Sequence, residues 1–118
     1  MVVLAVDEDI ECLNNLKRCI KESDNSVELV TFTDSVLALK YIKEHTVDIL
    51  FTEVRMSSVT GFELTKCLKE KMPNAYVVFV TRTEEHAIHA WAAHVNGYLL
   101  KPVDLQRVRA ELECMQVY

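Results

Sequence analysis

Basic residues are in deficit in this chain of 118 residues, which carries 13 Lys and Arg against 18 Asp and Glu. The formal net charge is therefore −5 at neutral pH, and no basic stripe is available to neutralise phosphates. This balance argues against direct nucleic-acid binding by the domain. Because half of the residues are apolar and 26% are charged, the composition also argues against disorder and against a collagen-like repeat.

Long hydrophobic runs are lacking as well. The longest, residues 1–6 and 75–80, are far too short to span a membrane. The first of them is cut off by Asp7 and has no basic region before it, so it does not match a signal peptide. We therefore predict a single domain over residues 1–118, with no membrane association and a cytoplasmic location.

Cysteine motifs for disulfide or metal chemistry are missing too, since the four cysteines form no CxxC pair and no ligand cluster. We expect them to be small, half-buried hydrophobic residues in a reducing cytosol. His86, His89 and His94 lie in one segment, and the first two can meet on one helical face. With no thiolate nearby, a solvated face is favoured over a metal site.

What the chain does have is a regular alternation of apolar runs and helical periodicities. The runs at 2–6, 27–32, 48–52, 76–80 and 98–100 are typical of strands buried on both faces. Helical spacing of apolar residues covers the segments 10–22, 34–44, 60–72, 84–94 and 105–115. Such alternation predicts an α/β fold, a five-stranded parallel sheet that is doubly wound in the flavodoxin-like (βα)5 manner.

Side chains suited to capping precede three of these helices. We expect Thr33 or Asp34 to cap the second helix, Thr83 the fourth and Asp104 the last. The apolar stripe of the second helix is expected to pair Val36 with Leu39 and Leu37 with Tyr41, and to continue at Ile42.

Polar side chains follow the strands, at the edge where open parallel sheets build their sites. Asp7 and Glu8 follow the first strand, Glu53 the third, Thr81 the fourth and Lys101 the fifth. Carboxylates that leave positions open for water and phosphate suit Mg²⁺, and a hydroxyl beside an ammonium suits phosphoryl oxygens. The placement points to phosphate and Mg²⁺ chemistry, and the alternative is a polar rim without a ligand.

Four segments that contain these strand-end residues follow one another along the chain. They are Asp7-Glu8-Asp9, Glu53-Val54-Arg55-Met56 with Gly61 eight positions after Glu53, Val77-Val78-Phe79-Val80-Thr81, and Gly97-Tyr98-Leu99-Leu100-Lys101-Pro102. In this order they resemble the receiver domain of two-component response regulators, and the resemblance covers essentially the whole chain. The segment from Tyr98 to Asp104 looks most like receivers attached to LytTR-type transcription regulators.

The resemblance implies a metal site and an acceptor. Asp7, Glu8 and Glu53 would hold Mg²⁺ together with the backbone carbonyl of Arg55. Glu53 would occupy the position of the phosphoacceptor.

It also implies a switch. Thr81 would bond the phosphoryl group and move toward it, so that Tyr98 swings inward. Lys101 would pair with the phosphoryl oxygens, and its bond to Pro102 would be cis. The simpler alternatives are a half-buried strand aromatic at Tyr98, a strand-end hydroxyl at Thr81 and a solvated charge at Lys101.

The sequence departs from the family at the centre of the site. Glu53 stands where an active receiver has aspartate, and Glu8 also stands where aspartate is usual. Each extra methylene moves a carboxylate by roughly 1.5 Å, whereas such sites tolerate errors of only about 0.5 Å. Ser57-Ser58 also replaces the Pro-Gly often found after the acceptor.

Two hypotheses follow for the function. The first is a signalling module without enzymatic activity, a pseudo-receiver or phosphomimetic form in which Glu53 impairs or prevents phosphoryl acceptance. The alternative is a functional Mg²⁺-dependent phosphoacceptor receiver that controls transcription through dimerisation. A phosphatase acting on other molecules has little support, because no additional base or nucleophile is visible.

The expected partners are a sensor histidine kinase and a second copy or an output domain. The family often dimerises through its fourth helix, fifth strand and fifth helix. The corresponding surface here is formed by residues 84–94, 98–100 and 104–115.

Overall fold

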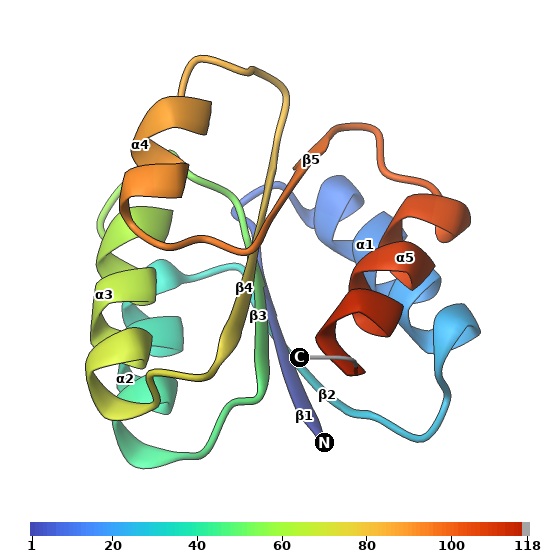
Figure 1. Cartoon of the computed structure of the whole chain (residues 1–118), viewed down its shortest axis with the longest axis horizontal. Helices are drawn as coiled ribbons and strands as arrows, with labels where there is room; N and C mark the ends of the chain where they lie inside the picture. The colour runs from blue at the N-terminus through green and yellow to red at the C-terminus, as the bar shows by residue number, and fades with distance from the viewer. Residues whose placement is uncertain (117–118) are drawn as a thin grey trace.

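The computed structural model describes residues 1–116, in which strands and helices alternate five times (Figure 1). Within these residues, no helix combines the length and the apolar character needed to cross a membrane. The strands are β1 (Val2–Val6), β2 (Glu28–Phe32), β3 (Ile49–Thr52), β4 (Tyr76–Thr81) and β5 (Gly97–Leu100). The helices are α1 (Ile10–Ser23), α2 (Ser35–Glu44), α3 (Gly61–Lys71), α4 (Ala87–Ala92) and α5 (Leu105–Gln116).

All strands are parallel and are arranged in the order β2-β1-β3-β4-β5. Helices α1 and α5 cover one face of the sheet, and α2, α3 and α4 cover the other (Figure 1). The register aligns Val6 with Thr52 of β3, which is itself aligned with Phe79 of β4. The predicted doubly wound α/β fold is confirmed, and the carboxyl ends of its central strands lie side by side.

The core consists of two apolar layers, one on each face of the sheet. In β1, Val3 and Ala5 pack in the layer under α1 and α5, whereas Leu4 and Val6 pack in the layer under α2, α3 and α4. All four side chains are fully buried. Because successive side chains of β1 are buried on opposite faces of the sheet, the strand has apolar residues throughout and no alternation of polar and apolar residues.

Four helices begin at side chains that accept hydrogen bonds from their first turn, among them α3, where the Thr60 hydroxyl accepts from the amide of Glu63. Asp9 Oδ1 accepts from the amides of Glu11 and Cys12 at the start of α1. Asp34 caps α2 in the same way, and Asp104 Oδ1 accepts from the amide of Arg107 in α5. The predicted caps at Asp34 and Asp104 are confirmed, and they satisfy amides that would otherwise lack a partner.

The expected apolar stripe of α2 is confirmed at Leu39, Tyr41 and Ile42, which pack in the core layer, but it is wrong at the start of the helix. Val36 and Leu37 are 49% and 50% exposed, and the buried residues are Ser35, Ala38 and Ile42. The Ser35 hydroxyl accepts a hydrogen bond of 3.1 Å from the amide of Val59. Because this buried contact fixes the start of the helix, the face at 35, 38 and 42 turns inward.

Helix α4 is shorter than the predicted 84–94, and Thr83 does not cap it. The Thr83 hydroxyl accepts from the amide of Glu85 within a turn, and the helix begins only at Ala87. At the other end, His94 has a positive φ of 63°, which reverses the chain toward β5. A left-handed residue cannot continue a right-handed helix, so α4 spans only Ala87–Ala92.

We predict that Gly61→Ala destabilises the fold through the loop between β3 and α3. A Cβ at Gly61 would lie 2.5 Å from the backbone oxygen of Glu53 and 3.2 Å from Cα of Val54. Because backbone atoms cannot give way cheaply, the free energy of unfolding should fall by about 1–3 kcal/mol in urea denaturation.

Gly97→Ala is the matched control, since a Cβ there would meet only the end of the flexible Glu111 side chain. It should cost clearly less than Gly61→Ala. Equal stability of Gly61→Ala and the wild-type chain would contradict the prediction.

Candidate functional site

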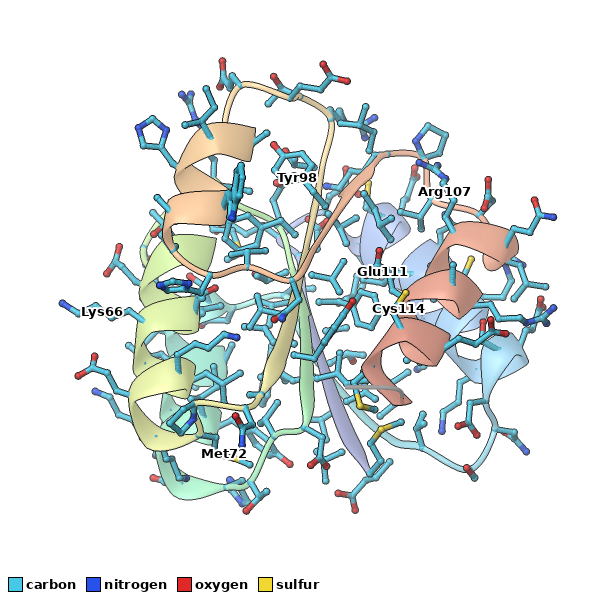
Figure 2. The ribbon with its side chains drawn as sticks, viewed as in Figure 1. Lys66, Met72, Tyr98, Arg107, Glu111 and Cys114 are labelled. Atoms are coloured by element: carbon cyan, nitrogen blue, oxygen red, sulfur yellow. The ribbon has the colours of Figure 1, made fainter. Side chains whose placement is uncertain are left out.

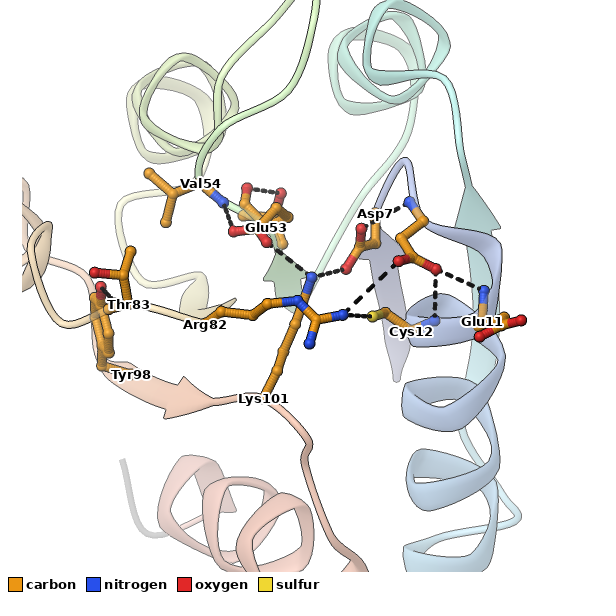
Figure 3. A network of polar contacts seen from close by, with 11 residues as sticks. Asp7, Glu11, Cys12, Glu53, Val54, Arg82, Thr83, Tyr98 and Lys101 are labelled. Atoms are coloured by element: carbon orange, nitrogen blue, oxygen red, sulfur yellow. Dashed lines mark hydrogen bonds and ion pairs between the residues drawn. The ribbon is translucent and has the colours of Figure 1, made fainter.

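A buried ammonium group lies at the carboxyl edge of the sheet between two carboxylates. Lys101 Nζ is 2.7 Å from Asp7 Oδ2 and 2.8 Å from Glu53 Oε1 (Figure 3). The side chains of Lys101, Asp7 and Glu53 are 6%, 5% and 15% exposed. Three of the predicted site residues therefore meet, and Lys101 is not the solvated charge that its type suggests.

The sheet itself holds these residues in place. The amide of Glu53 donates to the carbonyl of Val6 at 3.0 Å, and the amide of Lys101 donates to the carbonyl of Thr81 at 2.8 Å. Both bonds extend the parallel ladders by one residue beyond the strands. The peptide bond between Lys101 and Pro102 is cis, as the resemblance implied.

The two carboxylates determine the charge state of the lysine. Burial lowers the pKa of Lys101, but the hydrogen bonds and the charges of Asp7 and Glu53 outweigh it, so that the pKa is raised from its ordinary value. Lys101 is therefore a firmly protonated cation. Two carboxylates share this single positive charge, so that each of them has a cation within ion-pair distance.

Both oxygens of the Glu53 carboxylate accept hydrogen bonds. Oε1 bonds to Lys101, and Oε2 accepts from the amide of Val54 at 2.6 Å. The side chain therefore bends back on its own strand end on one side and reaches Lys101 on the other (Figure 3). The extra methylene of glutamate, compared with aspartate, gives the carboxylate this reach.

Glu8 does not join this cluster, although it follows Asp7 directly. Its Oε1 and Oε2 lie 2.9 and 3.0 Å from the amide nitrogen of Ser57, and Oε2 accepts from the Ser57 hydroxyl at 2.5 Å. The role of Ser57 was not predicted from the sequence. The feature that could have indicated it is the serine at a position where the family often has proline. Proline has no N–H and could not make the amide contact.

The expected Mg²⁺ ligands are not gathered in this arrangement. Within residues 1–116, no three side chains among His, Cys, Asp and Glu form a group able to hold a metal ion. Asp7 and Glu53 turn to Lys101, and Glu8 turns to Ser57. Arg55 lies in the same loop, where its exposed guanidinium pairs with Glu85 at 3.2 Å. The residues as arranged do not fit a magnesium site, and the ligand role of the Arg55 carbonyl stays a prediction.

The two predicted switch residues lie on neighbouring strands. Thr81 ends β4 and is 4% exposed; among the described residues, its hydroxyl makes no hydrogen bond to Glu53. Tyr98 of β5 is half-buried, and its hydroxyl donates to the carbonyl of Thr83 at 2.6 Å. Burial, with the nearby charges of acidic residues led by Glu53, raises the pKa of Tyr98. The sequence analysis did not foresee Thr83 as the acceptor.

One further cation borders the site. The exposed guanidinium of Arg82 lies 3.4 Å from Cys12 Sγ and 3.9 Å from Asp9 Oδ2 (Figure 3). Burial raises the pKa of the Cys12 thiol, so this sulfur is an uncharged acceptor at neutral pH.

Two expectations for cysteine and histidine need correction. Cys12 and Cys67 are half-buried as expected, but Cys19 is fully buried and Cys114 is exposed. The side chain of His86 is only 14% exposed and packs against Phe62, with ring centroids 6.4 Å apart. The turn before α4 directs this ring inward, so the solvated face contains only the other two histidines of the segment, 89 and 94.

The comparison with known proteins identifies the family of the chain. Residues 3–113 match the family model of the response regulator receiver domain. The chain is 31% identical over 115 residues to an uncharacterised response regulatory protein of Vibrio cholerae, covering 97% of this chain and 44% of that protein. It is 27% identical over 116 residues to the transcriptional regulatory protein YpdB of Escherichia coli K12, covering 98% and 48%. The chain thus spans less than half the length of these relatives.

Solved structures give the same result. The receiver domain of AraT, a response regulator from Geobacillus stearothermophilus, superposes with a TM-score of 0.87 at 30% identity, covering 98% of this chain and 92% of that one. The response regulatory domain of mrkE from Klebsiella pneumoniae gives a TM-score of 0.89 at 25% identity, covering 99% and 96%. Fold and strand-end residues together define an α/β signalling domain of the two-component type. The chain belongs to the response regulator receiver domain family.

We predict that Lys101→Met, which removes the ammonium but keeps an unbranched apolar side chain, destabilises the fold. Asp7 and Glu53 would stay buried without their cation, and the free energy of unfolding should fall by about 3–5 kcal/mol near neutral pH. Because folding raises the pKa of Lys101, its stabilisation is complete below the ordinary lysine pKa of 10.5 and is lost as the pH rises beyond that value.

Urea denaturation across a pH series measures both effects. The wild-type chain should lose stability at alkaline pH more steeply than Lys101→Met does. Lys66→Met, at an exposed position on α3, is the control and should change the stability by less than about 0.5 kcal/mol. A Lys101→Met variant as stable as the wild-type chain at neutral pH would refute the prediction.

Proposed function

We propose that this chain is a receiver-type signalling module in which Glu53 impairs phosphoryl acceptance and acts as a built-in substitute for a phosphorylated residue. One observation carries the proposal: the Glu53 carboxylate occupies the acceptor position and is already bonded to Lys101 at 2.8 Å. In the family, the corresponding lysine pairs with the phosphoryl group. Here a side-chain carboxylate is bonded to that lysine instead.

The hydrogen bonds of Glu53 oppose its use as a nucleophile. To attack phosphorus, a carboxylate oxygen needs a lone pair that points at the phosphoryl donor and is not engaged in a strong hydrogen bond. Both oxygens instead accept short hydrogen bonds, one from the Val54 amide at 2.6 Å and one from an ammonium. Hydrogen bonds to an ionised carboxylate are stronger than those between neutral groups, so both bonds stabilise the resting Glu53 and raise the barrier to attack.

The same carboxylate supports a fixed arrangement of the switch. Tyr98 packs half-buried near Phe79, with ring centroids 6.4 Å apart, and its hydroxyl bonds to the carbonyl of Thr83. This contact ties β5 to the loop that leads into α4. The mimicry proposed here acts through Lys101, the residue after β5, since Glu53 makes its side-chain bond to this lysine.

The signal passes to partners through the surface over residues 84–94, 98–100 and 104–115. Two large apolar side chains of α4 are prominent on it, since Ile88 and Trp91 are 83% and 82% exposed. Apolar side chains exposed to this degree on neighbouring turns are typical of protein contacts. A second copy or an output domain binds here in the cytoplasm, and a sensor histidine kinase is the upstream partner.

The decisive test is intact mass after incubation with Mg²⁺ and a small phosphoryl donor such as acetyl phosphate. We expect no phosphate adduct on the wild-type chain and an adduct on the double variant Glu8→Asp and Glu53→Asp, which restores an ordinary acceptor and withdraws the Glu8 carboxylate from Ser57. Glu53→Ala is the matched control for reaction elsewhere on the chain. An adduct on the wild-type chain, mapped to Glu53, would restore the alternative of a working phosphoacceptor.

Amide spectra of the same samples test the mimicry. The signals of Thr83 and Tyr98 in the unmodified wild-type chain should resemble those of the phosphorylated double variant Glu8→Asp and Glu53→Asp more than those of Glu53→Ala. If wild type and Glu53→Ala gave the same signals, the carboxylate would have no role in the switch.

A further inference from the structure

The acidic pocket contains a cation of its own, supplied by the chain. Asp7 and Glu53 are the two carboxylates of the pocket that are shielded from solvent, and each lies within 2.8 Å of the ammonium of Lys101. A divalent ion bound between them would lie close to that ammonium. Like charges at such separations repel by several kcal/mol at the effective dielectric of a partly buried site.

The third expected ligand is engaged as well. Glu8 accepts from the amide and the hydroxyl of Ser57, and this contact ties the loop after β1 to the loop after β3. A metal ion bound by carboxylates from both loops would make the same connection. To ligate an ion, Glu8 would have to give up these bonds, and Mg²⁺ tolerates little departure from octahedral geometry.

We infer that this receiver pocket is closed without a metal ion: Lys101 acts as its cation, the contact between Glu8 and Ser57 links its loops, and Mg²⁺ is thereby excluded. This inference concerns the same pocket as the proposed function and deepens it. It assigns the loss of metal binding to two contacts of this chain, one made by an ammonium and one by a serine.

Backbone amide spectra recorded during a Mg²⁺ titration test the inference directly. For the wild-type chain we expect no saturable shift at Glu8, Val54 or Ser57 through the millimolar range. For Lys101→Met, in which the ammonium is removed, we expect saturable shifts at these amides and an affinity at least about tenfold tighter. Lys66→Met is the charge-matched control, because the Lys66 side chain extends into solvent from α3 (Figure 2), and it should behave like wild type.

In Lys101→Met, the buried carboxylates of Asp7 and Glu53 lose their cation, and we expect the variant to fold less stably than the wild-type chain does. Its thermal unfolding is therefore followed first by circular dichroism. If it shows no cooperative transition, the double variant Glu8→Asp and Glu53→Asp takes its place. Shortening both side chains withdraws their carboxylates from Ser57 and Lys101 while the lysine remains, and we expect this variant to bind Mg²⁺ saturably. Ser58→Ala, a change at the exposed neighbour of Ser57, should leave the titration unchanged.

Two results would overturn the inference. One is saturable Mg²⁺ binding by the wild-type chain at Glu8 and Ser57. The other is the absence of binding in the folded replacement variants, which would mean that Lys101 and Ser57 do not keep the ion out. Phosphorylation is read separately by mass, so wild-type metal binding without an adduct would refute this inference alone, and an adduct on Glu53 would refute the proposed function.

Discussion

The ammonium group of Lys101 holds the carboxyl edge of the sheet together. It lies 2.7 Å from Asp7 Oδ2 and 2.8 Å from Glu53 Oε1, so that β1, β3 and β5 share one ion-pair cluster across the sheet. Buried carboxylates are tolerated only where a cation and hydrogen bonds compensate for lost solvation. The position of the Glu53 carboxylate depends on this cluster.

The Glu53 carboxylate makes two contacts, one to Lys101 and one to the amide of Val54. A longer side chain reaches the lysine and folds back to the amide of Val54, whereas a shorter one would leave an oxygen free for chemistry. Glu8 is also one methylene longer than aspartate, and its carboxylate contacts Ser57 in the loop after β3. The proposed closure of the pocket therefore rests on two side chains that are each one methylene longer than aspartate.

The sequence was sufficient to predict the fold and the convergence of Asp7, Glu53 and Lys101 at one edge of the sheet. Strands buried on both faces read as apolar runs, and the residues after them converge at one edge in any parallel sheet. The sequence did not predict where the Glu8 side chain points, because its direction depends on the amide and the hydroxyl of Ser57, 49 positions away. Nor could helical spacing foresee the short α4, since its end depends on the left-handed backbone of His94. The exposure of Val36 was missed because a tertiary hydrogen bond sets the rotation of α2.

A double-mutant cycle between Lys101 and Glu53 measures the central interaction most directly. The free energies of unfolding of Lys101→Met, Glu53→Gln and the double variant, compared with wild type in urea, give the coupling between the two side chains. The account predicts a favourable coupling above about 1 kcal/mol, with the cycle of Glu53→Gln and Lys66→Met additive within about 0.5 kcal/mol. Additivity of Lys101→Met and Glu53→Gln within the same limit would contradict it, since the ammonium and the carboxylate would then not act as a pair.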